Sequence, residues 1–517
     1  MDIQLRKETV CINETLMHDT MQVLLQNDII VPDTKSDMAK ILQIDSCAMV
    51  EKIGVGDKRA NIDGSVALTI LYVPENDEKP VCSINTTVPF QSLVENSMIN
   101  TASHCIAHAD AYHVEFSMIN SRKLSVKIIV ELDIRCIQEN NIEIVCDASA
   151  DMPIEKQSQD FWIYNLVNAS NTKINVRETL DFPSGKPSAA SILKTDAKIS
   201  NKDMRLISGK IVVKGSILLC SLYVSENNNI EAMEHEIPFT EVLDADGANE
   251  NCMCELELNI CRTQSMLRAD TSGNMRLLDV DIIIDADSCV TENTSMSALC
   301  DCFCASKKLL CETKPFSFDV LVGKGSAQHS LRATLALPEG APELVSVYNL
   351  MSKPYISGVS LSDGKAMVSG SVDCYILYLS SSATSPISTQ KAQIDFEIPI
   401  EIDNIDNTMD CDITAEVLHQ SYNITMTGEI ELRVSLIFDA KAISKKTSQL
   451  CVNVLADDDA LLDVRHGIIV YFVRSGDTLW KIAKKYNASP QLIAQINGLE
   501  NPDVLNVGQR LLIPNMV

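Results

Sequence analysis

One ten-residue pattern occurs three times in this chain, at residues 64–73, 215–224 and 370–379. Each copy begins with Gly-Ser and ends with Leu-Tyr followed by Val or Leu. The copies begin 151 and 155 residues apart, a spacing close to the usual size of one domain. Three copies of one module are more typical of a scaffold that presents surfaces than of an enzyme, which needs one asymmetric site. The repeat therefore favours a tandem array of similar domains.

Other sequence features recur around each copy in the same order. A proline-containing turn precedes each glycine by about thirty residues, a second proline follows it, and an apolar run closes the copy. The turns lie at residues 31–33, 182–184 and 337–339. The second prolines lie in segments 88–90, 237–239 and 398–400, and the apolar runs in segments 124–134, 277–286 and 430–438. They predict repeats at residues 1–158, 159–312 and 313–455, with cores at 32–137, 183–287 and 338–440.

Inside the repeats the apolar residues have a period of two. Val66, Leu68 and Ile70, for example, alternate with Ala67 and Thr69. Such alternation, bounded by clusters of Gly, Asn, Asp, Ser or Pro, is typical of strands joined by hairpins. We therefore expect strands of five to nine residues and three mainly β, sandwich-like or barrel-like repeats, each with its own core.

Two residues of the repeated pattern are expected to have structural roles. The glycine that opens each copy is expected to relieve a tight turn or a bulge. The tyrosine near its end, at Tyr72, Tyr223 and Tyr378, is expected to be half-buried with its hydroxyl at the rim.

Composition limits the class of protein. Hydrophobic residues make up 46% of the chain and charged residues 22%, which indicates a globular rather than a disordered protein. The formal net charge of −27 argues against binding to nucleic acid. The polar first eight residues predict no secretory signal, and the lack of an eighteen-residue apolar run predicts no membrane span.

The 18 cysteines form no compact framework, and without an export signal we expect all of them to be free thiols. Cys300, Cys302, Cys304 and the nearby Cys311 leave two interpretations open. Strict alternation places the first three on one face of a strand, whereas zinc ligands usually come as two closely spaced pairs. The favoured interpretation is a strand, and a metal or redox site is the alternative.

No catalytic centre is predicted. The one histidine cluster, His104, His108 and His113 beside Cys105, has no counterpart in the other repeats and no completing carboxylate pattern. Phosphate-loop, nucleophile-elbow and zinc-protease motifs are all missing from the sequence. We therefore expect no catalytic residue, no metal and no cofactor.

In the last fifty residues the apolar residues follow a different period. Strands are expected at 468–473 and 509–514, with a helix over residues 478–486 capped by Asp477. A second helix should begin at Pro490 and end at Gly498. The first helix places its apolar residues on one face: Leu479, Ile482, Ala483 and Tyr486. The predicted order is β-α-α-β.

These residues closely resemble the LysM family. The resemblance covers residues 469–514 and rests on the segments 471–483, 496–499 and 505–514. It implies a groove that binds glycans containing N-acetylglucosamine. Carried onto this chain, the groove is lined by Gly476, Asp477, Thr478, Leu479, Pro502, Val504, Leu505 and Asn506.

The upstream repeats resemble the SPOCS domain. The segment 31–37, Val-Pro-Asp-Thr-Lys-Ser-Asp, is close to the family's P-D-x-K-P-D opening, with Ser36 in place of the second proline. SPOCS repeats followed by one LysM domain are similar to the SipL-like clostridial spore-coat morphogenetic proteins. This resemblance implies a non-enzymatic adaptor in the mother-cell cytoplasm, at the forespore surface. Its LysM domain would bind the coat's basement-layer ATPase, stage IV sporulation protein A. The alternative is a protein of the spore cortex or cell wall that binds peptidoglycan or another N-acetylglucosamine glycan.

Charge and exposed apolar side chains suggest where a partner would bind. Residues 468–517 contain five basic and three acidic residues, so this segment is mildly basic on an acidic chain. We hypothesise that Ile468, Trp480 and Lys481 contribute to a partner-binding face, since large aromatic side chains anchor many interfaces. Two alternatives remain open: Trp480 serves mainly in packing, and the lysines form a solvated helix face.

Overall fold

The structure is a computed structural model that describes residues 3–337, 340–382, 384–457 and 467–515. In the described part of the chain, the repeats are built of antiparallel strands, and the two helices lie near the C-terminus. The predicted mainly β class is therefore confirmed. No helix in the described residues is long and apolar enough to cross a membrane.

Each repeat contains two three-stranded sheets. In repeat 1 one sheet has the order β1-β6-β5 and the other β2-β3-β4. The bounds are β1 Ile3–Ile30, β2 Met38–Gly56, β3 Arg59–Pro74, β4 Cys82–Glu95, β5 His104–Asn120 and β6 Lys123–Ala150. The two sheets enclose one hydrophobic core.

Repeats 2 and 3 have the same connectivity. The bounds in repeat 2 are β7 Ile154–Asp181, β8 Ala189–Ile207, β9 Lys210–Ser225, β10 Ile230–Asp244, β11 Met253–Ala269 and β12 Met275–Cys304. Those in repeat 3 are β13 Lys308–Leu335, β14 Leu344–Ser362, β15 Lys365–Ser380, β16 Ile387–Glu401, β17 Asp410–Ile424 and β18 Ile430–Asp457. Each of these repeats also has its own core.

The strands of the repeats are 14 to 30 residues long, so the expected length of five to nine residues is wrong. Asn and Ser residues also lie inside the strands, as at residues 168–171 of β7, because a strand face that is not fully buried accepts such residues. Register shifts absorb local irregularities, as between Thr15 and Met17 of β1.

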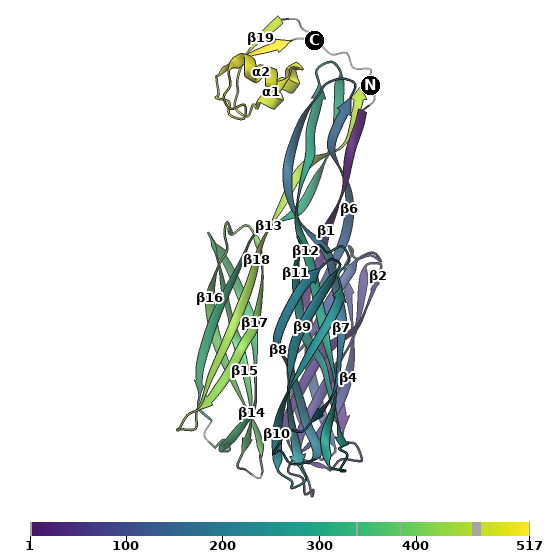
Figure 1. Cartoon of the computed structure of the whole chain (residues 1–517), viewed down its shortest axis with the longest axis vertical. Coiled ribbons are helices and arrows are strands. Elements are labelled where there is room, and N and C mark those ends of the chain that lie inside the picture. The colour runs from purple at the N-terminus through teal and green to yellow at the C-terminus, as the bar shows by residue number, and fades with distance from the viewer. Residues whose placement is uncertain (1–2, 338–339, 383, 458–466, 516–517) are drawn as a thin grey trace.

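The first and last strands of every repeat are the longest, at 28 to 30 residues. A strand of this length spans roughly 90 Å. One half of each long strand belongs to its own lobe, and the other half joins a common stalk (Figure 1). Apolar side chains from different repeats meet inside this stalk, among them Ile144, Phe161, Ala298, Phe318 and Leu450.

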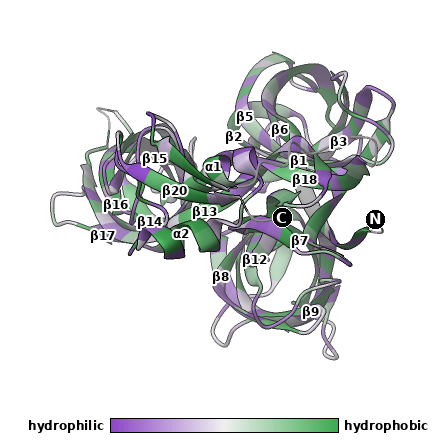
Figure 2. Ribbon diagram, turned by 90° about the horizontal axis from the view of Figure 1, so that it is seen from above, coloured by the Kyte–Doolittle hydropathy of each residue, from purple (hydrophilic) through white to green (hydrophobic). Residues whose placement is uncertain are grey.

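The three lobes surround a common axis when seen from above (Figure 2). The repeated Leu-Tyr pair explains this arrangement, because successive side chains of a strand point to opposite faces. In repeats 1 and 2 the tyrosine belongs to the core of its own lobe, whereas the leucine of all three repeats points to the other lobes. Leu71, Leu222 and Leu377 share one buried cluster with Leu193 and Tyr348, so side chains of all three repeats meet there.

The tyrosines are more deeply buried than expected. Tyr72, Tyr223 and Tyr378 are at most 1% exposed, so their hydroxyls do not lie at the rim. The Tyr72 hydroxyl donates to the carbonyl oxygen of Ser36 at 2.9 Å, and the Tyr223 hydroxyl donates to that of Pro187 at 3.1 Å. Burial raises the pKa of Tyr223 to about 12. Each bond ties the middle strand to the turn at the tip of its lobe.

The glycine of the pattern lies within a strand rather than at a turn. In repeats 1 and 3 it stands opposite a bulge of the neighbouring strand, as expected, and an aromatic ring covers it. A Cβ atom on Gly215 would lie 2.6 Å from the ring of Phe239 and 2.7 Å from the carbonyl oxygen of Asn201. Gly64 and Gly370 are covered in the same way. The glycine therefore makes room for a ring on the neighbouring strand.

This pairing also corrects the alignment of residues 398–400 in repeat 3 with residues 88–90 and 237–239. Gly64 pairs with Phe90 and Gly215 with Phe239, each directly after a proline. Gly370 pairs with Phe396, and Pro399 lies three positions further along the strand. The structurally repeated residue is therefore the phenylalanine, not the proline.

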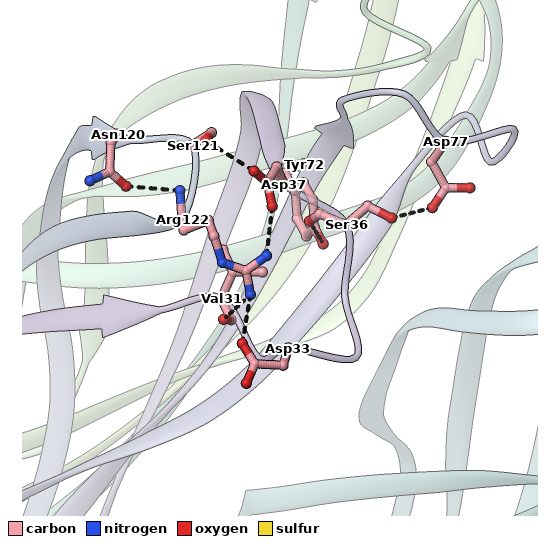
Figure 3. A network of polar contacts seen from close by, with 9 residues as sticks. All are labelled: Val31, Asp33, Ser36, Asp37, Tyr72, Asp77, Asn120, Ser121 and Arg122. Atoms are coloured by element: carbon pink, nitrogen blue, oxygen red, sulfur yellow. Dashed lines mark hydrogen bonds and ion pairs between the residues drawn. The ribbon is translucent and has the colours of Figure 1, made fainter.

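A polar network closes the tip of repeat 1 (Figure 3). The Arg122 guanidinium donates to Asp37 at 2.6 Å and to Asp33 at 3.1 Å. These carboxylates belong to the turn that carries the SPOCS-like motif, and the Tyr72 hydroxyl holds the same turn at Ser36. The two acidic residues of the motif thus fix the turn between β1 and β2.

One buried ion pair crosses between lobes. Lys194 of β8 is 6% exposed, and its ammonium lies 2.8 Å from Asp45 of β2 and 3.0 Å from Asp196. Asn349 of β14 donates to Asp196 at 3.1 Å, so all three repeats contribute to the cluster. A buried charge needs such partners.

The expectation that all cysteines are free is wrong for one pair. Cys105 and Cys136 face each other across β5 and β6, with Cα atoms 4.1 Å apart, and form a disulfide. Directly opposed residues of an antiparallel pair project to the same face, which brings the two sulfur atoms together.

Candidate functional site

The C-terminal domain has the predicted β-α-α-β order. It consists of β19 Gly467–Phe472, α1 Leu479–Tyr486, α2 Pro490–Asn497 and β20 Arg510–Asn515. The N-cap of α1 is Thr478, whose side chain accepts from the backbone N–H of Lys481 at 3.2 Å, so the expected cap at Asp477 is wrong. Gly498 ends α2 in the left-handed conformation, as predicted.

Asp477 instead stabilises the turn before α1. Its carboxylate accepts from the Arg474 backbone N–H at 2.8 Å and from the Tyr471 hydroxyl at 2.7 Å. Both hydrogen bonds favour the charged form, so the pKa of Asp477 lies below its usual value. Lys481 donates to the carbonyl of Gly476 at 3.0 Å and braces the same turn.

Most of the predicted groove residues are accessible. Gly476, Thr478, Pro502, Val504 and Asn506 are exposed, and Val504 as a residue is 60% exposed. Asp477 and Leu505 are half-buried. Leu479 is 5% exposed and packs in the domain core, so its side chain is not accessible to a ligand as the prediction requires.

Trp480 contacts the stalk and is half-buried. Its Nε1 donates to Asp301 of β12 at 2.9 Å, and its ring packs edge-on against Phe303 with centroids 5.1 Å apart. Lys484 also donates to Asp301, at 2.6 Å. We call Asp301 and Phe303 the latch, because they hold α1 against the end of the stalk.

Ile468 lies in different surroundings. It is 68% exposed on β19, and Val470 and Phe472, two and four residues further on, are 51% and 60% exposed. Alternate positions of a strand share one face, so these three side chains form an apolar stripe. The residues predicted to form a partner-binding face therefore lie in different surroundings. Trp480 is held by the latch, whereas Ile468 faces solvent. Lys481 is also exposed.

Sequence reasoning missed both the latch and the full stripe. The continuous apolar run at residues 468–473 was a signal for the stripe, because a short strand that buries one face exposes the side chains of the other. Nothing in the sequence connects Asp301 with Trp480, which lies 179 residues further along the chain.

Comparison with protein families agrees with this geometry. A LysM domain model matches residues 471–514, and a SipL SPOCS domain model matches residues 37–119, 188–267 and 345–425. The chain belongs to the SipL-like proteins with SPOCS repeats and a LysM domain. No solved structure matches it.

The SPOCS matches in this SipL-like protein correspond to four strands per repeat. They cover most or all of β2–β5, β8–β11 and β14–β17, whereas the long strands that build the stalk lie outside them. SPOCS and LysM domains are non-catalytic binding domains, which fits a sporulation adaptor or a glycan-binding role. Among the described residues no group of three His, Cys, Asp or Glu side chains is placed to hold a metal ion.

Proposed function

We propose that this protein is a non-enzymatic adaptor of spore-coat morphogenesis, working in the mother-cell cytoplasm at the forespore surface. Its LysM domain binds the coat basement-layer ATPase, stage IV sporulation protein A. The observation that carries the proposal is the position of the LysM domain at one end of a long β scaffold, away from the tips of the three lobes (Figure 1). Such a molecule can connect two binding partners at a distance.

The apolar stripe supports a protein partner. Ile468, Val470 and Phe472 expose aliphatic and aromatic surface without neighbouring carboxylates on β19. A protein interface buries such side chains at its centre. Trp480 would join this interface only after it leaves the latch, so the stripe is the surface that a partner meets first.

The test is a binding titration of the full-length protein against the purified ATPase. Ile468→Arg places a charge in the middle of the expected interface and should weaken binding at least about tenfold. Val507→Arg is the matched control, since Val507 is 73% exposed in the loop before β20. Equal affinity of both variants and the unsubstituted protein would overturn the stripe as the binding surface.

The accessible groove supports a second candidate, binding to an N-acetylglucosamine glycan. Gly476, Thr478 and Val504 are exposed while Trp480 is held by the latch, so the groove could accept a ligand without release of the latch. Titration with chitin oligosaccharides tests this directly. Saturable binding that Val504→Asp abolishes, together with no affinity for the ATPase, would establish the alternative.

A further inference from the structure

Three thiols from three strands meet beside the latch. Cys302 lies on β12, Cys311 on β13 and Cys451 on β18. The Sγ atoms of Cys311 and Cys451 are 3.0 Å apart, and Cys302 hydrogen-bonds to Cys311. Cys302 and Cys451 are fully buried, whereas Cys311 is partly exposed. One thiol of the cluster can therefore meet a small solute while the other two stay protected.

The backbone accounts for this short separation. β13 pairs with β18 in an antiparallel register that shifts between Glu312 and Thr313, so Thr313 stands opposite Cys451 and Cys311 opposite Val454. The irregularity brings the Cys311 side chain diagonally over Cys451. Two sulfur atoms at this distance need only a small movement to bond.

The surroundings also set the acidity of these thiols in opposite directions. Hydrogen bonding with Cys302 and Cys451, with a smaller contribution from the charge of Lys484, lowers the pKa of Cys311. The pKa values of Cys302 and Cys451 are raised, first because each hydrogen-bonds to Cys311 and then because of burial. The other described thiols with a shifted pKa are all raised, mainly by burial; Cys300 is an example. The thiolate is the reactive form of cysteine, so Cys311 combines reactivity with access.

We propose that Cys311 and Cys451 are a redox-active pair that forms a reversible disulfide when the protein meets a hydroperoxide. The Cys311 thiolate attacks one peroxide oxygen, the O–O bond breaks, and the leaving oxygen takes a proton to depart as water or an alcohol. Cys311 becomes a sulfenic acid. The Cys451 sulfur then attacks this sulfur, the S–O bond breaks, and hydroxide leaves as water with the Cys451 proton. Each sulfur loses one electron, and the peroxide gains two.

The pair of Cys311 and Cys451 lies close to the latch that holds the LysM domain. Cys302 stands in sequence between Asp301 and Phe303, the two residues of the latch, and Lys484 of α1 acts on both Asp301 and Cys311. The proposal does not depend on the identity of the LysM partner. It concerns chemistry in the stalk.

The experiment uses the reduced full-length protein treated with one equivalent of hydrogen peroxide, quenched with iodoacetamide and mapped by mass spectrometry. We expect a Cys311–Cys451 linked peptide that thioredoxin or dithiothreitol reverses. In Cys451→Ala the sulfenic acid on Cys311 should persist and be captured by dimedone. Cys302→Ala should slow alkylation of Cys311 at least about tenfold, since it removes a hydrogen bond to the thiolate.

Cys374→Ser is the matched control, because Cys374 is a buried free cysteine in the core of repeat 3. It should leave the linked peptide unchanged, and circular dichroism melts should show that every variant is folded. Alkylation of Cys311 no faster than that of Cys300, a link from Cys311 to any cysteine other than Cys451, or stoichiometric zinc in the purified protein would each overturn the proposal.

Discussion

The three lobes and the LysM domain are attached to the molecule in opposite ways. The lobes share buried apolar side chains at Leu71, Leu222 and Leu377, and their long strands share the interior of the stalk. The LysM domain is held mainly by one aromatic contact and a carboxylate that accepts two hydrogen bonds. The lobes therefore behave as one body, whereas the LysM domain is a separable module.

The free energies that these contacts contribute support this difference. Burial of one leucine side chain contributes roughly 1.5–3 kcal/mol, and the lobes bury many such side chains between them. Hydrogen bonds to a charged group contribute about 1.5–3 kcal/mol each, less when the group is partly exposed, as Asp301 is. The latch is thus strong enough to favour one position of the LysM domain and weak enough for a partner to displace it.

The largest effect is expected from a charge in the junction between lobes. Leu222→Asp should prevent cooperative folding of all three repeats, because it buries a carboxylate among apolar side chains of the three lobes. Thermal unfolding followed by circular dichroism checks this. Val242→Asp is the control, since Val242 is 52% exposed on β10 and should change stability little. A variant in which only repeat 2 melts early would break the view of the lobes as one body.

The buried ion pair between lobes should come next. Lys194→Met leaves Asp45 and Asp196 without their cation and should lower the free energy of unfolding by roughly 3–5 kcal/mol, measured by urea denaturation. Lys210→Met, on an exposed pair with Asp244, is the control. A loss below about 1 kcal/mol would show that the junction does not depend on this charge.

The same pair predicts a pH dependence. Burial opposes the charge of Lys194, but the two carboxylates outweigh it, so its pKa is raised in the folded state. Its contribution is therefore complete below the unfolded value of about 10.4 and declines as pH rises above it. The stability difference between the unsubstituted protein and Lys194→Met should shrink between neutral pH and strongly alkaline pH, and a constant difference would contradict the ion pair.

A smaller effect is expected inside one lobe. Gly215→Ala places a methyl group against the Phe239 ring and a backbone carbonyl, which should cost roughly 1–3 kcal/mol. Gly54→Ala should be close to neutral, because no atom lies within 4 Å of the added carbon. Comparison of their urea midpoints checks the difference, and similar stability of the two variants would remove the proposed role of the glycine.

The sequence predicted the number of repeats, the β class and the LysM domain, because these follow from long-range repetition and from strong local periods. It could not assign Leu222 to the junction and Tyr223 to the lobe core, since both are apolar neighbours on one strand. The partners of Trp480 were also beyond reach, because contacts between distant segments leave no local pattern. The cross-strand pair of Cys105 and Cys136 depends on register, which the alternation alone does not specify.

The separable attachment of the LysM domain can be measured through Trp480 in the full-length protein. The second tryptophan, Trp162, is 55% exposed, so the measurement uses a Trp162→Phe background. Asp301→Asn should shift the Trp480 emission to the red and increase its quenching by acrylamide, because the neutral amide holds Trp480 and Lys484 less strongly. The melting temperature of the β scaffold should stay within about 2 °C. Unchanged emission, or a scaffold that melts markedly earlier, would contradict a rigid body that carries a releasable LysM domain.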